Sequence, residues 1–169
     1  MKLAFSILIV ALSFVACKPK ADANANEAFE KNSKTVLTYI QGVQNENVDY
    51  SSFSKDFKSL NTWFDAKDSI SLEKFIEGDR KMFEKFNFKL IDSVPVFLPG
   101  VNPLTKEVDG SVRLYSTWEI STQKTDSTEA KSGLLKMYES YDFDADGKIN
   151  YLQAYGDFNG LLNYLTTKN

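Results

Sequence analysis

The chain has no histidine and only one cysteine, Cys17, among its 169 residues. Without imidazole, the Ser-His-Asp and Cys-His schemes of nucleophilic catalysis are excluded, and so are metal sites built on histidine. A single cysteine cannot form a disulfide within the chain. Proton transfer near neutral pH would therefore need an Asp, Glu, Lys or Tyr side chain with a shifted pKa. The sequence indicates no cofactor.

Basic charge is also scarce and has no pattern. The chain carries 20 Lys and Arg against 23 Asp and Glu, a net charge of −3, and it has no basic stripe. Proteins that bind nucleic acids usually concentrate Lys and Arg on one face. The composition therefore predicts no nucleic-acid partner and no electrostatic adhesion to anionic lipid.

The N-terminus is typical of an exported protein. Lys2 precedes an apolar run over residues 3–14, which is shorter than the about 20 residues that a membrane helix needs. Residues 1–16 are therefore predicted to be a signal peptide. Residues 13–17 resemble a lipobox, with Phe14 in place of the usual leucine and Ala16 before Cys17. The alternative is an ordinary secretory signal with a chance cysteine.

This pattern predicts a bacterial lipoprotein whose Cys17 carries the lipid. A diacylglycerol on that sulfur supplies two chains, which are enough for stable anchoring. The expected location is the cell envelope, on the periplasmic or surface side of a bacterial membrane. Residues 17–26 are polar and rich in small side chains, so we expect the lipidated cysteine to be followed by a flexible tether. Residues 27–169 would then form one domain.

The first part of this domain has helical periodicity. Residues 27–44 place apolar side chains at intervals of three and four, which predicts an amphipathic helix. Residues 51–60 indicate a shorter helix, with Phe53, Phe57 and Leu60 on one side. Residues 72–86 predict the clearest helix, and Ser71 is placed to cap its N-terminus.

The second part alternates with a period of two. The segments expected to be strands are residues 88–98, broken by Pro95, and residues 111–122, 134–143 and 148–155. Phe158 and the leucines after it suggest a short final helix. Helices followed by a strand meander predict an α+β fold, with N-terminal helices packed on a curved antiparallel sheet.

This order resembles the cone-shaped fold, a cystatin-like roll, of nuclear transport factor 2 and the SnoaL-like proteins. The resemblance rests on five segments: Tyr39 to Gly42 at the end of the first helix, the helix at 71–86, the tryptophan strand at 112–120, the hairpin into 134–143, and 144–155. It implies a pocket between the helices and the sheet, and dimers formed through the sheet. It implies no particular activity, because this fold serves enzymes and binding proteins alike.

Two carboxyl groups fall on apolar faces of the predicted elements. Asp79 lies in the apolar stripe of the helix at 72–86, and Glu139 shares a strand face with Met137 and Tyr141. Because an unpaired buried carboxylate is costly, each must be paired, protonated or directed into a wet pocket. If both face one cavity, they are the candidate acid and base of an enzyme. Candidates for the lining of that pocket, or for ordinary core positions, are Tyr39, Trp63, Trp118 and Tyr141.

A third acidic cluster has the spacing of a calcium loop. Asp142, Asp144 and Asp146, followed by Gly147, match the start of an EF-hand loop. The twelfth position, which needs a bidentate Glu, is Gln153, and the flanks are predicted strands. The favoured interpretation is a hairpin turn, and a weak calcium site is the alternative.

The sequence leaves the function open among three hypotheses. The first is a membrane-anchored protein that binds a small apolar ligand or an envelope partner. The second is a small-substrate enzyme, similar to an isomerase or dehydratase, that uses Asp79 and Glu139. The third is a structural subunit of an envelope assembly. The strand face with Tyr115 and Tyr138 is either a dimer or partner surface, or an ordinary solvated face.

Overall fold

The structure is a computed structural model that describes residues 23–62, 65–93, 95–124 and 129–167. The predicted signal peptide, Cys17 and Trp63 lie outside these residues. The helices and strands of the described ranges are α1 (Ala23–Gln44), η1 (Tyr50–Ser52), β1 (Phe53–Asn61), β2 (Ser69–Ser71), α2 (Leu72–Phe83), β3 (Phe86–Leu90), β4 (Val96–Val101), β5 (Val108–Thr122), β6 (Ser132–Phe143), β7 (Ile149–Tyr155) and α3 (Phe158–Thr166).

The strands form a single sheet in the order β2-β1-β7-β6-β5-β3, and β4 also pairs with β5. The long strand β5 has β6 on one side and both β3 and β4 on the other, one along each half of its length. The pairing of β1 with β7 is parallel, and the other pairings are antiparallel. Helices packed on this sheet confirm the α+β class.

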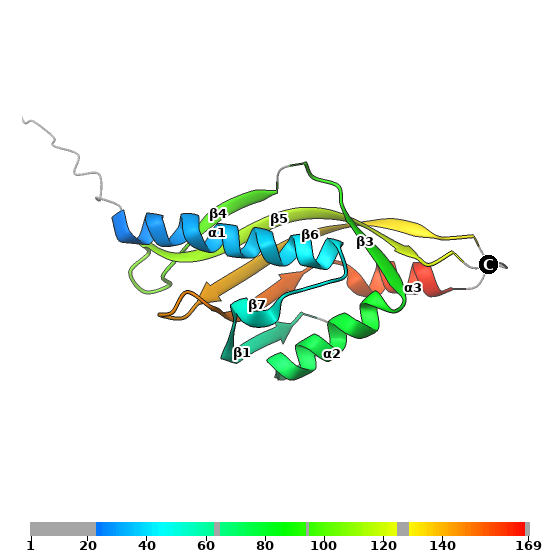
Figure 1. Cartoon of the computed structure of the whole chain (residues 1–169), viewed down its shortest axis with the longest axis horizontal. Helices are drawn as coiled ribbons and strands as arrows, with labels where there is room; N and C mark the ends of the chain where they lie inside the picture. Colours follow the sequence, from blue (N-terminus) through cyan, green and yellow to red (C-terminus); the bar gives the residue numbers. More distant parts are fainter. Residues whose placement is uncertain (1–22, 63–64, 94, 125–128, 168–169) are drawn as a thin grey trace, which may run out of the picture.

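The three helices pack against the sheet (Figure 1). α1 packs along β5 and also contacts β3 and β4, while α3 packs on β6. α2 contacts β1 and β2 at one end of the strand order and β3 at the other end. Because α2 contacts strands at both ends of the strand order, α1 and α2 together cover the middle strands.

The alternation of β5 and β6 decides which side chains face that space. Val112, Leu114, Trp118 and Ile120 are buried on β5, as predicted, while Tyr115 between them is half-exposed. Leu135, Glu139 and Tyr141 are buried on the same face of β6. The period of two thus separates a core face from an outer face along both strands.

Close contact between α1 and the start of β5 depends on a glycine. Gly110 has a φ of +82°, and a Cβ at this position would lie 2.9 Å from the Cβ of Ala28. The Asn32 side-chain amide donates a 2.9 Å hydrogen bond to the Gly110 carbonyl, which satisfies both groups where water is excluded. The absence of a side chain at Gly110 therefore lets the N-terminal half of α1 rest on the sheet.

The predicted helix at residues 51–60 is wrong, because this segment is strand β1. Phe53 and Phe57 are both buried, and a spacing of four residues fits one face of a strand as well as one face of a helix. Ser59 decides between the two, because it is also buried on the face of Phe57, whereas Leu60 is only half-buried. The two phenylalanines fit both patterns, so they do not distinguish a helix from a strand by themselves.

Other boundaries also differ from the prediction. The predicted strand at 88–98 is two strands, β3 and β4, separated around Pro95, which has no N–H for a ladder. The predicted helix at 72–86 ends at Phe83, and the buried Phe86 starts β3 opposite Thr122. Residues 23–26 of the segment expected to be a tether belong to α1, which begins at Ala23 in an alanine-rich stretch that favours a helix.

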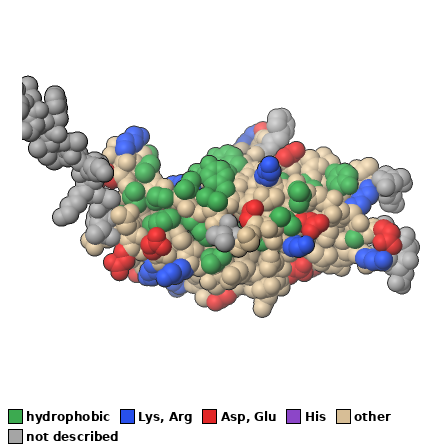
Figure 2. Space-filling model, turned by 90° about the horizontal axis from the view of Figure 1, so that it is seen from above, with side chains coloured by type: hydrophobic (Ala, Val, Ile, Leu, Met, Phe, Trp, Pro, Cys, Tyr) green, Lys and Arg blue, Asp and Glu red, His purple; other side chains and the backbone are tan. Residues whose placement is uncertain are grey.

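The described part of the chain contains no helix that is long and apolar enough to cross a membrane. On the face shown in Figure 2, Lys and Arg side chains lie in separate spots among acidic and hydrophobic ones. On the outer face of the sheet, Tyr115, Tyr138 and Tyr155 form a row with ring centroids 5.0 and 6.1 Å apart.

Candidate functional site

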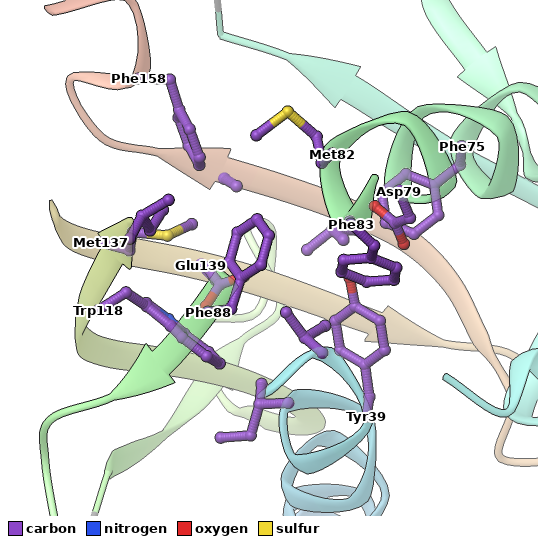
Figure 3. Close-up of a pocket in the computed structure, with 15 residues that line it drawn as sticks. Tyr39, Phe75, Asp79, Met82, Phe83, Phe88, Trp118, Met137, Glu139 and Phe158 are labelled. Atoms are coloured by element: carbon purple, nitrogen blue, oxygen red, sulfur yellow. The ribbon is translucent and has the colours of Figure 1, made fainter. Parts of the chain in front are cut away.

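A cavity of about 160 Å³ lies between α1, α2 and the core face of the sheet (Figure 3). Its walls are mostly aromatic and aliphatic, and two carboxyl groups reach it. The lining residues are Tyr39, Ile40, Val43, Phe75, Asp79, Met82, Phe83, Phe88, Trp118, Ile120, Met137, Glu139, Leu152, Ala154 and Phe158. Apolar walls with a few convergent polar groups are typical of sites for small molecules.

Asp79 reaches the cavity from α2. Its Oδ2 accepts a 2.8 Å hydrogen bond from the Tyr50 hydroxyl, which comes from the short turn before β1. Burial raises the pKa of Asp79 to about 6, and the bond from Tyr50 lowers it by a smaller amount. The nearby carboxylate also contributes, after burial, to the raised pKa of Tyr50. Asp79 therefore titrates just below neutral pH.

Glu139 reaches the cavity from the sheet and is only 6% exposed. Its Oε1 accepts a 2.9 Å hydrogen bond from the Tyr141 hydroxyl, and its Oε2 lies 3.5 Å from the Ser116 hydroxyl. The Trp118 indole N–H in turn donates to Ser116 Oγ over 3.1 Å. Burial raises the pKa of Glu139 to about 7, and these two hydrogen bonds lower it by less. Near neutral pH this group is thus present in both its acid and its carboxylate form.

Tyr39 adds a third polar group from α1. Its pKa is raised well above its ordinary value by burial, then by the negative charge of Asp79 and then by that of Glu139. Its ring packs edge-on against Phe53 and Tyr141, at centroid distances of 5.2 and 6.2 Å. The hydroxyl therefore stays protonated and is available as a hydrogen-bond donor inside the cavity.

Four of the residues singled out from the sequence meet at this one cavity, namely Tyr39, Asp79, Trp118 and Glu139. Tyr141 is fully buried behind the wall and contributes by holding Glu139. Ser116 was missed, although the sequence carried a signal for it. Ser116 interrupts the apolar alternation of β5, just as Glu139 interrupts that of β6.

The acidic residues after β6 form a tight turn. Asp142 pairs with Arg113 at 3.1 Å, while Asp144 Oδ1 accepts hydrogen bonds from the backbone N–H groups of Asp146 and Lys148. Gly147 completes the turn at a φ of +74°. The carboxylates do not converge, and the described residues contain no group of three acidic or thiol side chains that could hold a metal. The hairpin interpretation was correct.

No known family model and no curated protein matches this sequence. Solved structures do match. A protein assigned as a polyketide cyclase from Silicibacter sp. TM1040 is 19% identical, with a TM-score of 0.61 over 83% of this chain and 98% of that one. An LEH-like epoxide hydrolase from M. tuberculosis is 16% identical, with a TM-score of 0.55 over 80% and 90% of the two chains.

A third match comes from a protein that is named only for its fold. The NTF2-like protein of Anabaena variabilis ATCC 29413 is 14% identical, with a TM-score of 0.56 over 79% of this chain and 89% of that one. Identities this low establish a shared fold and no shared activity. With its helices closed over the sheet, this chain has the fold of the SnoaL-like and nuclear transport factor 2-like proteins.

Proposed function

We propose that this protein binds a small, mostly apolar molecule in the cavity between α1, α2 and the sheet. The observation that carries the proposal is the cavity itself, about 160 Å³ with aromatic and aliphatic walls. An engineered protein cavity of similar size and lining binds benzene. A ring of six atoms, or a short branched chain, is therefore the size of group that this space accommodates.

The polar groups of the cavity favour a ligand with one oxygen. Glu139 with a pKa of about 7 can donate or accept a hydrogen bond at neutral pH, and the Tyr39 hydroxyl can donate one. A hydroxyl or carbonyl group on the apolar body would accept the hydrogen bond of Tyr39, whereas a pure hydrocarbon would leave that hydroxyl donor unpaired. The proposed ligand is thus a small cyclic or branched alcohol or ketone.

Cyclohexanol and cyclohexanone are suitable probes, followed by thermal unfolding of the purified protein. At a concentration of 100 times the Kd, a probe should stabilise the protein by about 2.7 kcal/mol. Ala154→Phe, which puts a ring into the cavity, should abolish this shift, and the smaller Ala154→Leu should reduce it. Gln153→Phe is the matched control, because residue 153 alternates to the outer face of β7 and should leave the shift intact. No shift with either probe in the wild-type protein would contradict the proposal.

The second candidate is an enzyme that transfers a proton to or from the bound molecule. It is supported by one observation, that Asp79 and Glu139 both line this cavity with pKa values raised to about 6 and about 7. Acid and base groups of this kind act best with pKa values near the working pH. One solved structure with this fold is an epoxide hydrolase, so apolar epoxides belong in the panel of test substrates. The Glu139→Gln variant separates the two candidates, because it should keep binding and lose turnover.

We further propose that a lipid on Cys17 anchors the protein to a bacterial membrane in the cell envelope. The support is the short apolar run that ends at the only cysteine of the chain. Cells grown with an alkyne-labelled fatty acid should yield labelled protein in the membrane fraction. Cys17→Ser should remove the label completely, since no other cysteine is present. Label that persists in this variant would contradict the anchor.

The outer face of the sheet is proposed as a surface for a second copy of the chain or an envelope partner. Tyr115 is 50% exposed and Tyr155 is 46% exposed, and the rings of both pack at a tilt against Tyr138. Tyrosines of this kind are enriched in protein interfaces. Sedimentation of the purified protein tests the homodimer directly.

A further inference from the structure

The cavity continues into a second hollow that leads outward. This outer hollow, of about 510 Å³, shares six lining residues with the cavity: Phe75, Asp79, Met82, Leu152, Ala154 and Phe158. Beyond them its lining comes from β1, β2, α2, β3 and α3, and it includes Ser59, Thr62 and Thr166. A bound molecule longer than one ring would therefore extend past Asp79 into a more polar space.

The charges of the outer hollow are mostly positive. Apart from Asp79, its charged lining residues are Lys81 and Lys85. Lys81 is paired with Glu77 at 2.5 Å, one turn away on α2. Lys85 is exposed and forms no ion pair within the described residues. Lys85 is thus the lysine of this rim whose ammonium group has no ion-pair partner among the described residues.

We propose that the natural ligand is an amphipathic organic anion, with a ring that carries one hydroxyl or carbonyl oxygen in the cavity and a carboxylate at the rim beside Lys85. This inference rests on the proposed function and adds the chemical class of the ligand. An anionic group is disfavoured inside the cavity itself, because burial there is costly and Glu139, which lines the cavity but not the outer hollow, would repel it. Lys85 offers it a partner at the point where it stays hydrated.

The test compares three probes with the same hydroxyphenyl ring: 4-(4-hydroxyphenyl)butyrate, 4-(4-hydroxyphenyl)butan-1-ol and 4-(4-hydroxyphenyl)butylamine. Their affinities are measured by titration calorimetry on the wild-type protein and on Lys85→Gln. The acid should bind the wild-type protein at least three-fold more tightly than the alcohol. Lys85→Gln should weaken the acid about three-fold and leave the alcohol unchanged, which is the size expected for an ion pair at an exposed site.

Lys34→Gln is the matched control. Lys34 is also exposed, loses the same charge, forms no ion pair within the described residues, and lines neither the cavity nor the outer hollow. This control should leave all three affinities unchanged. It therefore distinguishes a local contact at the rim from a general effect of the surface charge of the protein.

Three results would overturn the inference, and they differ in what they imply for the cavity. If the acid and the alcohol bind equally well and Lys85→Gln changes neither affinity, the cavity still binds ligands. The anionic head group is then ruled out. If the amine binds most tightly, the head group of the ligand is a cation that pairs with Asp79. Failure of all three probes to bind would also count against the cavity as a binding site.

Discussion

Replacing Glu139 with glutamine should stabilise the folded protein at pH 8 and remove most of the pH dependence of its stability above pH 6. The folded state raises the pKa of Glu139 from 4.5 to about 7, because the group is buried. Above pH 7 the folded protein must therefore keep Glu139 as a charged carboxylate in the buried wall of the cavity. Glutamine has the same shape, carries no charge, and can still accept the hydrogen bond from Tyr141.

The direction of the pH effect follows from proton linkage. Between pH 4.5 and 7 the folded protein binds more protons at Glu139 than the unfolded chain does, so its stability falls as the pH rises through this window. Asp79 adds a similar fall between pH 3.8 and about 6. With 1.36 kcal/mol for each pKa unit, the Glu139 contribution is on the order of 3 kcal/mol.

Urea unfolding at pH 5, 6, 7 and 8 measures this effect. The wild-type and Glu139→Gln curves of stability against pH should converge near pH 5 and separate toward pH 8. Glu30→Gln, on the exposed side of α1, is the control and should follow the wild-type curve. Parallel curves for wild type and Glu139→Gln would show that Glu139 is not buried in its charged form.

Replacing Phe57 with alanine should destabilise the protein by about 3–5 kcal/mol, the usual cost of removing a buried phenylalanine. Phe57 is 1% exposed, and its ring packs 5.0 Å from Phe53 and 5.1 Å from Phe75. It therefore ties β1 to α2, the helix that closes over the cavity. The loss should also weaken ligand binding, because α2 carries Asp79.

Equilibrium unfolding in urea gives the free energy for this variant. Leu104→Ala is a suitable control, since Leu104 is 89% exposed in the turn between β4 and β5 and should change stability by less than about 0.5 kcal/mol. A cost below about 1 kcal/mol for Phe57→Ala would mean that β1 does not belong to the cooperative core.

Local patterns were sufficient for the long strands and for the two acids. The alternation along β5 and β6 separates the two faces of the sheet without any tertiary information, and Glu139 is conspicuous because it interrupts the core face. Asp79 could be found in the same way from the apolar stripe of α2. Charged residues on apolar faces were thus the most informative signal in this sequence.

Long-range pairing could not be predicted from the same patterns. β1 reaches its place by pairing in parallel with β7, nearly a hundred residues later, and nothing within residues 53–61 specifies that partner. The outer hollow depends on this pairing, because Ser59 and Thr62 line it together with Ala154. The outer hollow and the position of Lys85 at its rim therefore depend on the assembled strands and not on local sequence patterns.

The length of α1 sets the height at which the protein would meet its ligand. Its 22 residues rise by about 1.5 Å each, so Tyr39 lies about 24 Å along the axis from Ala23. If Cys17 holds the first turn at a bilayer and the helix stands upright, the cavity is about three Debye lengths above the lipid headgroups at physiological salt. An anionic ligand would then arrive from the aqueous phase without electrostatic repulsion by acidic lipids.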